Sequence, residues 1–141
     1  MLPAVERYCE AIFELAEDDI DVLQVRIAER LGVSRPAVSE MTARLVDDGF
    51  LAVADGRLAL TGAGIATAES AVRRHRLAER FLVDVLGLGW AEAHDAASVW
   101  QGVIDDRTEP AIVRLLGDPE TCPHGNPIPG KSLGADTVAL A

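Results

Sequence analysis

Residues 22–60 read VLQVRIAERLGVSRPAVSEMTARLVDDGFLAVADGRLAL, and this stretch decides the fold. Its pattern predicts, in chain order, a helix over 23–31, a turn at 32–34, a helix over 35–49 and strands over 51–54 and 57–60. Asp55-Gly56 between the two apolar runs is a strong hairpin signal, because a two-residue type I′ turn needs positive φ at both positions. A helix pair followed by a small hairpin predicts a winged helix-turn-helix, whose second helix enters the major groove of DNA.

The second predicted helix has the features of a DNA-reading helix. Ser34 is a good N-cap, and Pro36 suits the first turn, where a missing N–H costs nothing. Its expected exposed side consists of Arg35, Ser39, Glu40 and Arg44. Hydroxyl and guanidinium groups there can reach phosphates and base edges. A simpler interpretation stays open, in which Ser34 only caps, Ser39 is only solvated, and the module binds protein rather than DNA.

Charge is unevenly distributed along the 141 residues, whose formal net charge is −10. Residues 1–21 hold one arginine against seven acids, and residues 22–61 hold five basic and five acidic groups. The acidic excess therefore lies outside the predicted DNA module. Because affinity for DNA rises with phosphate neutralisation, a neutral module predicts weak non-specific binding and a need for dimerisation.

The two cysteines and the apolar segments bear on the compartment. Cys9 and Cys122 lack zinc-finger spacing, which favours a reduced cytosol over a disulfide framework. No apolar run approaches the roughly 18 residues of a membrane span, and acidic residues interrupt the N-terminal segment where a signal peptide would be apolar. We therefore expect a cytoplasmic protein with no membrane partner.

The remainder of the chain is predicted to be helical. Periodic apolar residues predict further helices over about 3–16, 62–86, 91–104 and 109–116. A Pro- and Gly-rich segment follows residue 117. The fold class expected is mainly α, with a winged helix-turn-helix domain at 1–62, an all-helical metal-binding and dimerisation domain at 63–130, and a tail or linker at 131–141.

Candidate metal ligands lie in the helical part. His75 and Glu79 are four residues apart and so share one helix face, and His94 begins the next helix. Imidazole and carboxylate together suit a divalent transition metal: iron(II), manganese, cobalt, nickel or zinc. Cys122 and His124 add possible soft ligands. Spacing of this kind also fits histidines that only pack or lie on the surface.

Four motifs together resemble the diphtheria-toxin-repressor family of iron- and manganese-dependent regulators. They are RIAERLGVSRPAVSEMTARLVDDG at 26–49, RHRLAERFLVDVLGL at 74–88, HDAASVW at 94–100 and CPHGNPIPG at 122–130. The resemblance implies a cytoplasmic homodimer that binds palindromic double-stranded operators when divalent metal, iron(II) or manganese(II), is bound. Zinc, cobalt or nickel could substitute.

The resemblance implies a first metal site at His75, Glu79 and His94, which are all present. Larger family members complete this site from a C-terminal SH3-like domain. We expect that domain to be absent here, so that water or the segment from Cys122 to His124 fills the coordination shell. Arg76 and Asn126 match groups that hold an anion beside the site.

The family's second metal site is expected to be lost or rebuilt. The positions of its Met, Cys, Glu and His ligands hold Arg7, Ser98, Gln101 and Gly102. Glu10 matches one carboxylate of the manganese-responsive branch. An arginine at position 7 places a permanent positive charge where a cation would bind.

The DNA-facing positions implied by the resemblance are better preserved. Together with the helix pattern, they give Arg26, Ser34, Arg35, Pro36, Ser39 and Arg44 as candidate DNA-binding residues. Asp47 and Gln24 replace basic residues of the family. The function expected is a metal-responsive transcriptional repressor controlling iron or manganese homeostasis, and not an enzyme. Two alternatives stay open: a DNA-binding dimer without metal control, and a metal-binding or protein-interaction module that no longer engages DNA.

Overall fold

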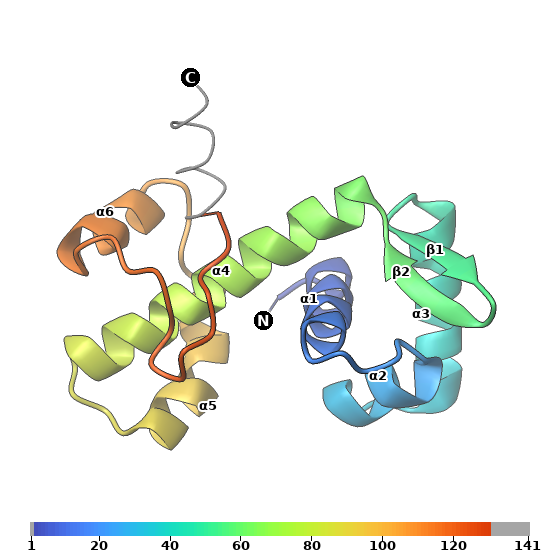
Figure 1. Cartoon of the computed structure of the whole chain (residues 1–141), viewed down its shortest axis with the longest axis horizontal. Coiled ribbons are helices and arrows are strands. Elements are labelled where there is room, and N and C mark those ends of the chain that lie inside the picture. The colour runs from blue at the N-terminus through green and yellow to red at the C-terminus, as the bar shows by residue number, and fades with distance from the viewer. Residues whose placement is uncertain (1, 131–141) are drawn as a thin grey trace. The chain divides into compact units, whose positions relative to one another are not determined.

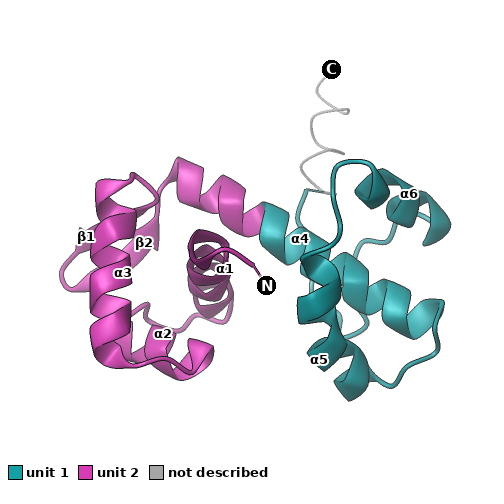
Figure 2. Cartoon of the chain, turned by 180° about the vertical axis from the view of Figure 1, so that it is seen from behind, with its two compact units in different colours: residues 1, 70–141 teal, residues 2–69 magenta. Residues whose placement is uncertain are grey.

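The computed structural model describes residues 2–130, which form two compact units (Figures 1 and 2). The first, here called the wing unit, comprises Leu2–Glu69, and the second, the helical unit, begins at Ser70. The wing unit holds α1 (Ala4–Glu17), α2 (Gln24–Leu31), α3 (Arg35–Asp47), β1 (Leu51–Ala54) and β2 (Arg57–Leu60). The division falls inside α4 (Gly62–Asp84), whereas the expected boundary after residue 62 lies at the start of that helix. The expected tail at 131–141 lies outside the described residues.

The wing unit is a winged helix-turn-helix, as expected. Gly32 ends α2 in the left-handed conformation, and Ser34 caps α3 by accepting a hydrogen bond from the Ala37 N–H. The hairpin pairs Leu51 with Leu60 and Ala54 with Arg57. Its turn has φ of 54° at Asp55 and 74° at Gly56, the positive values that the sequence predicted.

One apolar core holds the wing unit together. Helices α1, α2 and α3 and both strands contribute to it. Its buried members are Tyr8, Ile12, Leu15, Val22, Ile27, Ala28, Val38, Leu45, Leu51 and Leu58. Thr42 is the buried polar residue of α3, and its hydroxyl donates to the Val38 carbonyl at 2.7 Å. Burial of one face of α3 leaves the opposite face in solvent.

The start of α4 is attached to the wing unit by two contacts. The Thr61 hydroxyl donates to the Gly49 carbonyl at 2.6 Å and accepts from the Gly64 N–H, so it caps the helix. Gly64 lies so close to the Phe50 carbonyl that a Cβ would collide with it, whereas Gly62 has open space. Only glycine allows the backbone of α4 to approach this carbonyl without displacement.

The helical unit packs the rest of α4 with α5 (Trp90–Gln101) and α6 (Thr108–Leu115). Its apolar core consists of Ala78, Leu82, Ala93, Ala97 and Ile104. The expected helix over 91–104 ends earlier, because the chain makes tight turns at Gly102 and Val103. No helix among residues 2–130 is long and apolar enough to cross a membrane.

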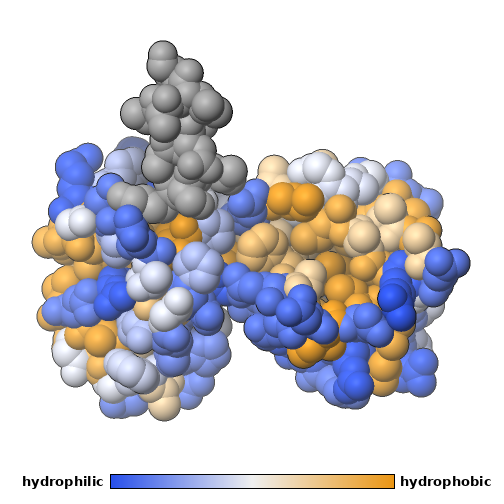
Figure 3. Space-filling model, viewed as in Figure 1, coloured by the Kyte–Doolittle hydropathy of each residue, from blue (hydrophilic) through white to orange (hydrophobic). Residues whose placement is uncertain are grey.

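Several large apolar side chains of the helical unit remain exposed. Hydrophobic residues are visible among polar ones on the face shown in Figure 3. The exposed members are Val85, Leu86, Trp90, Val99, Trp100, Val103 and Leu115. Val99, near the end of α5, and Val103, two residues after this helix, are 73% and 68% exposed. An apolar surface of this kind is typical of an interaction site.

Candidate metal centre and nucleic-acid interface

Glu79 is the residue around which ligand-type side chains gather in the helical unit. It is buried on α4, one turn after His75. Its Oε1 lies 3.2 Å from His75 Nε2. Its Oε2 lies 3.4 Å from His94 Nδ1 and 3.1 Å from His124 Nδ1. One carboxylate thus faces three imidazoles.

These side chains form two overlapping groups with the spacing of metal ligands. One group is His75, Glu79 and His94, and the other is Glu79, Cys122 and His124. Within each group the ligand atoms lie within 4.8 Å of one another. The structure therefore brings the predicted trio together and adds the Cys122–His124 pair through the shared carboxylate. Imidazole, carboxylate and thiolate donors fit a borderline divalent transition metal.

A tight turn presents Cys122 and His124. The Cys122 N–H donates to the Asn126 carbonyl at 2.8 Å, and the Gly125 N–H donates to the Cys122 carbonyl at 2.9 Å. Gly125 has a φ of 89°, which favours glycine there. The Trp90 ring meets the His124 ring edge-on, with centroids 5.6 Å apart. Two backbone hydrogen bonds within the turn and one aromatic contact therefore fix its conformation.

Arginines of α4 hold the segment that contains this turn. Arg80 donates to the Thr121 and Cys122 carbonyls at 2.9 and 3.1 Å. Arg76 donates to the Pro127 carbonyl at 2.6 Å. One terminal nitrogen of Arg76 is therefore bonded to a backbone carbonyl, although the resemblance implied that Arg76 holds an anion. These contacts between arginines and backbone carbonyls were not predicted, although four arginines within eight residues of one helix were a visible signal.

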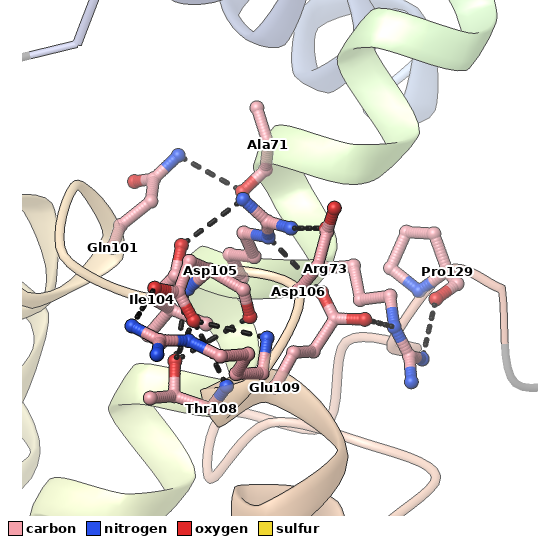
Figure 4. Close-up of polar contacts among 11 residues, drawn as sticks. Ala71, Arg73, Gln101, Ile104, Asp105, Asp106, Thr108, Glu109 and Pro129 are labelled. Atoms are coloured by element: carbon pink, nitrogen blue, oxygen red, sulfur yellow. Dashed lines mark hydrogen bonds and ion pairs between the residues drawn. The ribbon is translucent and has the colours of Figure 1, made fainter.

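Two more arginines connect α4 to α6, and Figure 4 shows Arg73 between Glu109 and Pro129. Arg73 donates to Glu109 and to the Pro129 carbonyl at 3.0 Å. Arg74 donates to Glu109, to Asp106 and to the Ile104 carbonyl. Burial disfavours the charged form of Arg74, but Glu109 and Asp106 outweigh it and raise its pKa. The ligand-bearing segment and α6 are therefore both held on α4 by charge-assisted hydrogen bonds.

The electrostatics of the cluster keep Glu79 ionised. Burial by itself would raise the pKa of Glu79, but the hydrogen bond and charge of His75, followed by those of His94, lower it below its ordinary value. A carboxylate that stays deprotonated in a buried setting is ready to bind a cation.

Gln101 has a different place from the one that the resemblance implied. Its side chain is buried, with Oε1 2.9 Å from His75 Nδ1 and Nε2 2.9 Å from the Ala71 carbonyl. It contacts a candidate ligand of the first site. Ser98 and Gly102, which match other second-site positions, are exposed on and just after α5. Arg7 lies half-buried on α1 of the wing unit.

The remaining cysteine belongs to the core. Cys9 is fully buried on α1, and burial raises the pKa of its thiol to about 11. A thiol that stays protonated is a poor metal ligand. Of the two cysteines, Cys122 is therefore the one placed to donate to a metal.

The predicted DNA-facing residues lie on exposed parts of the helix-turn-helix. Arg35, Pro36, Ser39 and Arg44 are exposed on α3, and Ser34 is its exposed N-cap. Arg26 is exposed on α2, 3.5 Å from Glu29. Gln24 donates to Thr42 at 3.4 Å and so joins α2 to α3. The exposed face of α3 thus has hydroxyl and guanidinium groups available to a ligand.

A winged helix-turn-helix followed by a helical unit with a histidine–carboxylate cluster defines a class of regulator with separate DNA and metal modules. Residues 1–58 match the N-terminal DNA-binding domain of iron-dependent repressors, and residues 61–130 match the metal-binding and dimerisation domain of the same family. The chain belongs to the iron-dependent repressor family.

Individual relatives agree with this assignment. The chain is 45% identical to the iron-dependent repressor IdeR of Mycobacterium leprae, over all of this chain and 62% of the relative. It is 43% identical to the diphtheria toxin repressor of Corynebacterium diphtheriae, over 92% of this chain and 58% of the relative. A manganese-dependent transcriptional repressor solved with manganese superimposes with a TM-score of 0.85 at 39% identity, over 90% and 59% of the two chains. The chain spans about three fifths of the length of these relatives.

Proposed function

We propose that this protein is a metal-responsive, DNA-binding transcriptional repressor that acts in the cytoplasm. The observation that carries the proposal is the buried Glu79 carboxylate surrounded by His75, His94 and His124 in a family of metal-dependent repressors. Repression of genes for iron or manganese homeostasis follows from what the relatives are named for.

His75, Glu79 and His94 are the proposed core ligands, and Cys122 and His124 the proposed additional ones. All five lie in the helical unit. Bound metal supplies a cross-link between α4, α5 and the turn at 121–127. Iron(II) and manganese(II) are the metals proposed, since relatives are named for each. A thiolate donor favours iron(II) over manganese(II), and zinc or cobalt would also bind.

Arg26, Ser34, Arg35, Pro36, Ser39 and Arg44 are the proposed DNA-binding residues. A neutral module with few phosphate contacts binds DNA weakly, so useful affinity needs two copies on one duplex. The exposed apolar residues of the helical unit are the proposed pairing surface. Two-fold pairing would match a palindromic operator.

A metal titration of the parent and His75→Ala tests the site. We expect about one strong divalent site per protomer in the parent and much weaker binding in the variant. Metal at a hundred times its Kd should stabilise the parent by about 2.7 kcal/mol, because it binds only the folded state. Asp95→Asn, an exposed change beside His94, is the control. Two tight sites in the parent would show a rebuilt second pocket, and no binding would favour a metal-independent repressor.

A further inference from the structure

Gln101 has a buried side chain next to the proposed metal site but is not one of the proposed ligands. It ends α5, and its amide bridges two points of α4: the Ala71 carbonyl and the ring of His75. Both distances are 2.9 Å, and all three residues are buried. A buried amide with partners on both sides has a defined orientation.

The Ala71 carbonyl decides that orientation. A carbonyl oxygen can only accept a hydrogen bond, so the group of Gln101 facing it must be the NH₂. Gln101 therefore presents its oxygen to His75. The opposite orientation would place two oxygens against each other at Ala71 and leave two nitrogens facing each other at His75. An oxygen at 2.9 Å from Nδ1 requires that Nδ1 carry the proton.

We propose that Gln101 is a positioning residue of the metal site, which holds the Nδ1–H form of His75 and so directs the Nε2 lone pair to the metal. Nε2 is the ring nitrogen on the Glu79 side, 3.2 Å from Oε1. Without metal, Nε2 carries a proton that it donates to the ionised Glu79, and a bound metal ion takes the place of this proton. The proposal rests on the proposed metal site. It assigns to the first site a side chain at a position where the family resemblance implied a second-site ligand.

The glutamine suits this role better than a carboxylate would. A carboxylate could accept from His75 but would place a negative charge against the Ala71 carbonyl, which also accepts the His75 backbone N–H in the regular helix pattern. An amide satisfies both neighbours without a net charge. Hydrogen-bond partners of this kind around ligating histidines typically change metal affinity by about 10- to 100-fold when they are removed.

The test compares three variants of the full chain with zinc as the metal. Gln101→Leu removes the acceptor while keeping similar volume, and Gln101→Glu restores an acceptor for His75. Gln24→Leu is the matched control, because it makes the same change in the wing unit. Long-range ¹H–¹⁵N NMR of the zinc-loaded protein shows which ring nitrogen of His75 is protonated and which binds zinc. Zinc titration gives affinity and stoichiometry.

We expect one zinc-bound form, with Nδ1–H and zinc on Nε2 of His75, in the parent, Gln24→Leu and Gln101→Glu, and loss of this single form in Gln101→Leu. Zinc affinity should fall about 10- to 100-fold in Gln101→Leu only. An Nε2–H tautomer in the parent, or unchanged affinity in Gln101→Leu, would overturn the proposal. A second zinc ion in Gln101→Glu would also overturn it, by showing that this position serves a second site. Failure of zinc to bind the parent would reject the proposed metal site, whereas unchanged affinity in Gln101→Leu with one zinc ion bound would reject only the role of Gln101.

Discussion

At the scale of single residues, the cluster depends on how one carboxylate is shared. Glu79 contacts three histidines that come from α4, α5 and the turn at 121–127. Spacing placed His75 and Glu79 on one helix face, and the family resemblance made them and His94 candidate ligands. The Cys122–His124 segment was expected from the family resemblance as one of two ways to fill the coordination shell, but the arginine contacts to backbone carbonyls that hold it on α4 were not predicted.

Cys122 gives the site a spectroscopic signature. With cobalt(II) as the bound metal, we expect a thiolate-to-metal charge-transfer band in the near ultraviolet. Cys122→Ser should remove the band and weaken binding, because the hydroxyl is a much poorer ligand than a thiolate. Cys9→Ala is the control and should leave the band unchanged, since Cys9 is buried in the wing unit with a raised pKa. A band that persists in Cys122→Ser would remove the thiolate from the ligand set.

At the scale of elements, the helices and the hairpin follow from local signals. Ser34, the Asp55-Gly56 turn and the apolar periodicity predicted α3, β1 and β2 with ends within two residues of those observed. Predicted helices over 62–86 and 91–104 ran past the true ends, because turn contacts among residues 82–88 and 99–103 compete with helix continuation. The role of Gln101 was out of reach, since it requires the contact between α4 and α5.

The junction between hairpin and α4 provides a matched pair of glycines. Gly64→Ala should lower the free energy of unfolding by about 1–3 kcal/mol, because its Cβ would collide with the Phe50 carbonyl. Gly62→Ala, two residues earlier with open space around it, should be neutral or stabilising. Chemical denaturation of metal-free protein measures both. Equal stabilities of the two variants would show that α4 does not need this close approach.

The exposed face of α3 carries the DNA prediction. Ser39→Glu places a negative charge against the phosphates, so we expect operator affinity to fall roughly tenfold or more with folding unchanged. Ser70→Glu makes the same change at an exposed position on α4 and should bind as the parent does. Fluorescence anisotropy with a labelled duplex measures the affinity, and circular dichroism checks the fold. Parental affinity in Ser39→Glu would mean that α3 does not lie in the groove.

At the scale of the whole molecule, the acidic composition is unfavourable for the proposed DNA binding. A net charge of −10 opposes DNA binding, but the segment from 22 to 61 is neutral. The exposed apolar side chains near the end of α5 are the proposed surface through which a weakly charged module would pair with a second copy. Leu77, an apolar residue of α4, does not belong to this surface, because it is buried within the helical unit.

Assembly can be tested at Val99 and Val103. Replacing both by Asp should convert a dimer into a monomer, because four buried charges would face one another across the two-fold axis. Val53→Asp, at an exposed valine on the hairpin, is the control and should remain dimeric. Sedimentation velocity at micromolar concentration distinguishes the species. A parent that sediments as a monomer would remove both the dimer and the argument for a palindromic operator.

The central claim, that metal controls DNA binding, is tested most directly by one titration. A labelled duplex is selected from a random pool with metal-loaded protein, and its affinity is then measured by anisotropy with iron(II) or manganese(II) and with chelator. We expect metal to tighten binding by about 5- to 150-fold, the range typical of coupled sites, and His75→Ala to lose this response. Equal affinity with metal and with chelator would contradict the account and leave a DNA-binding protein without metal control.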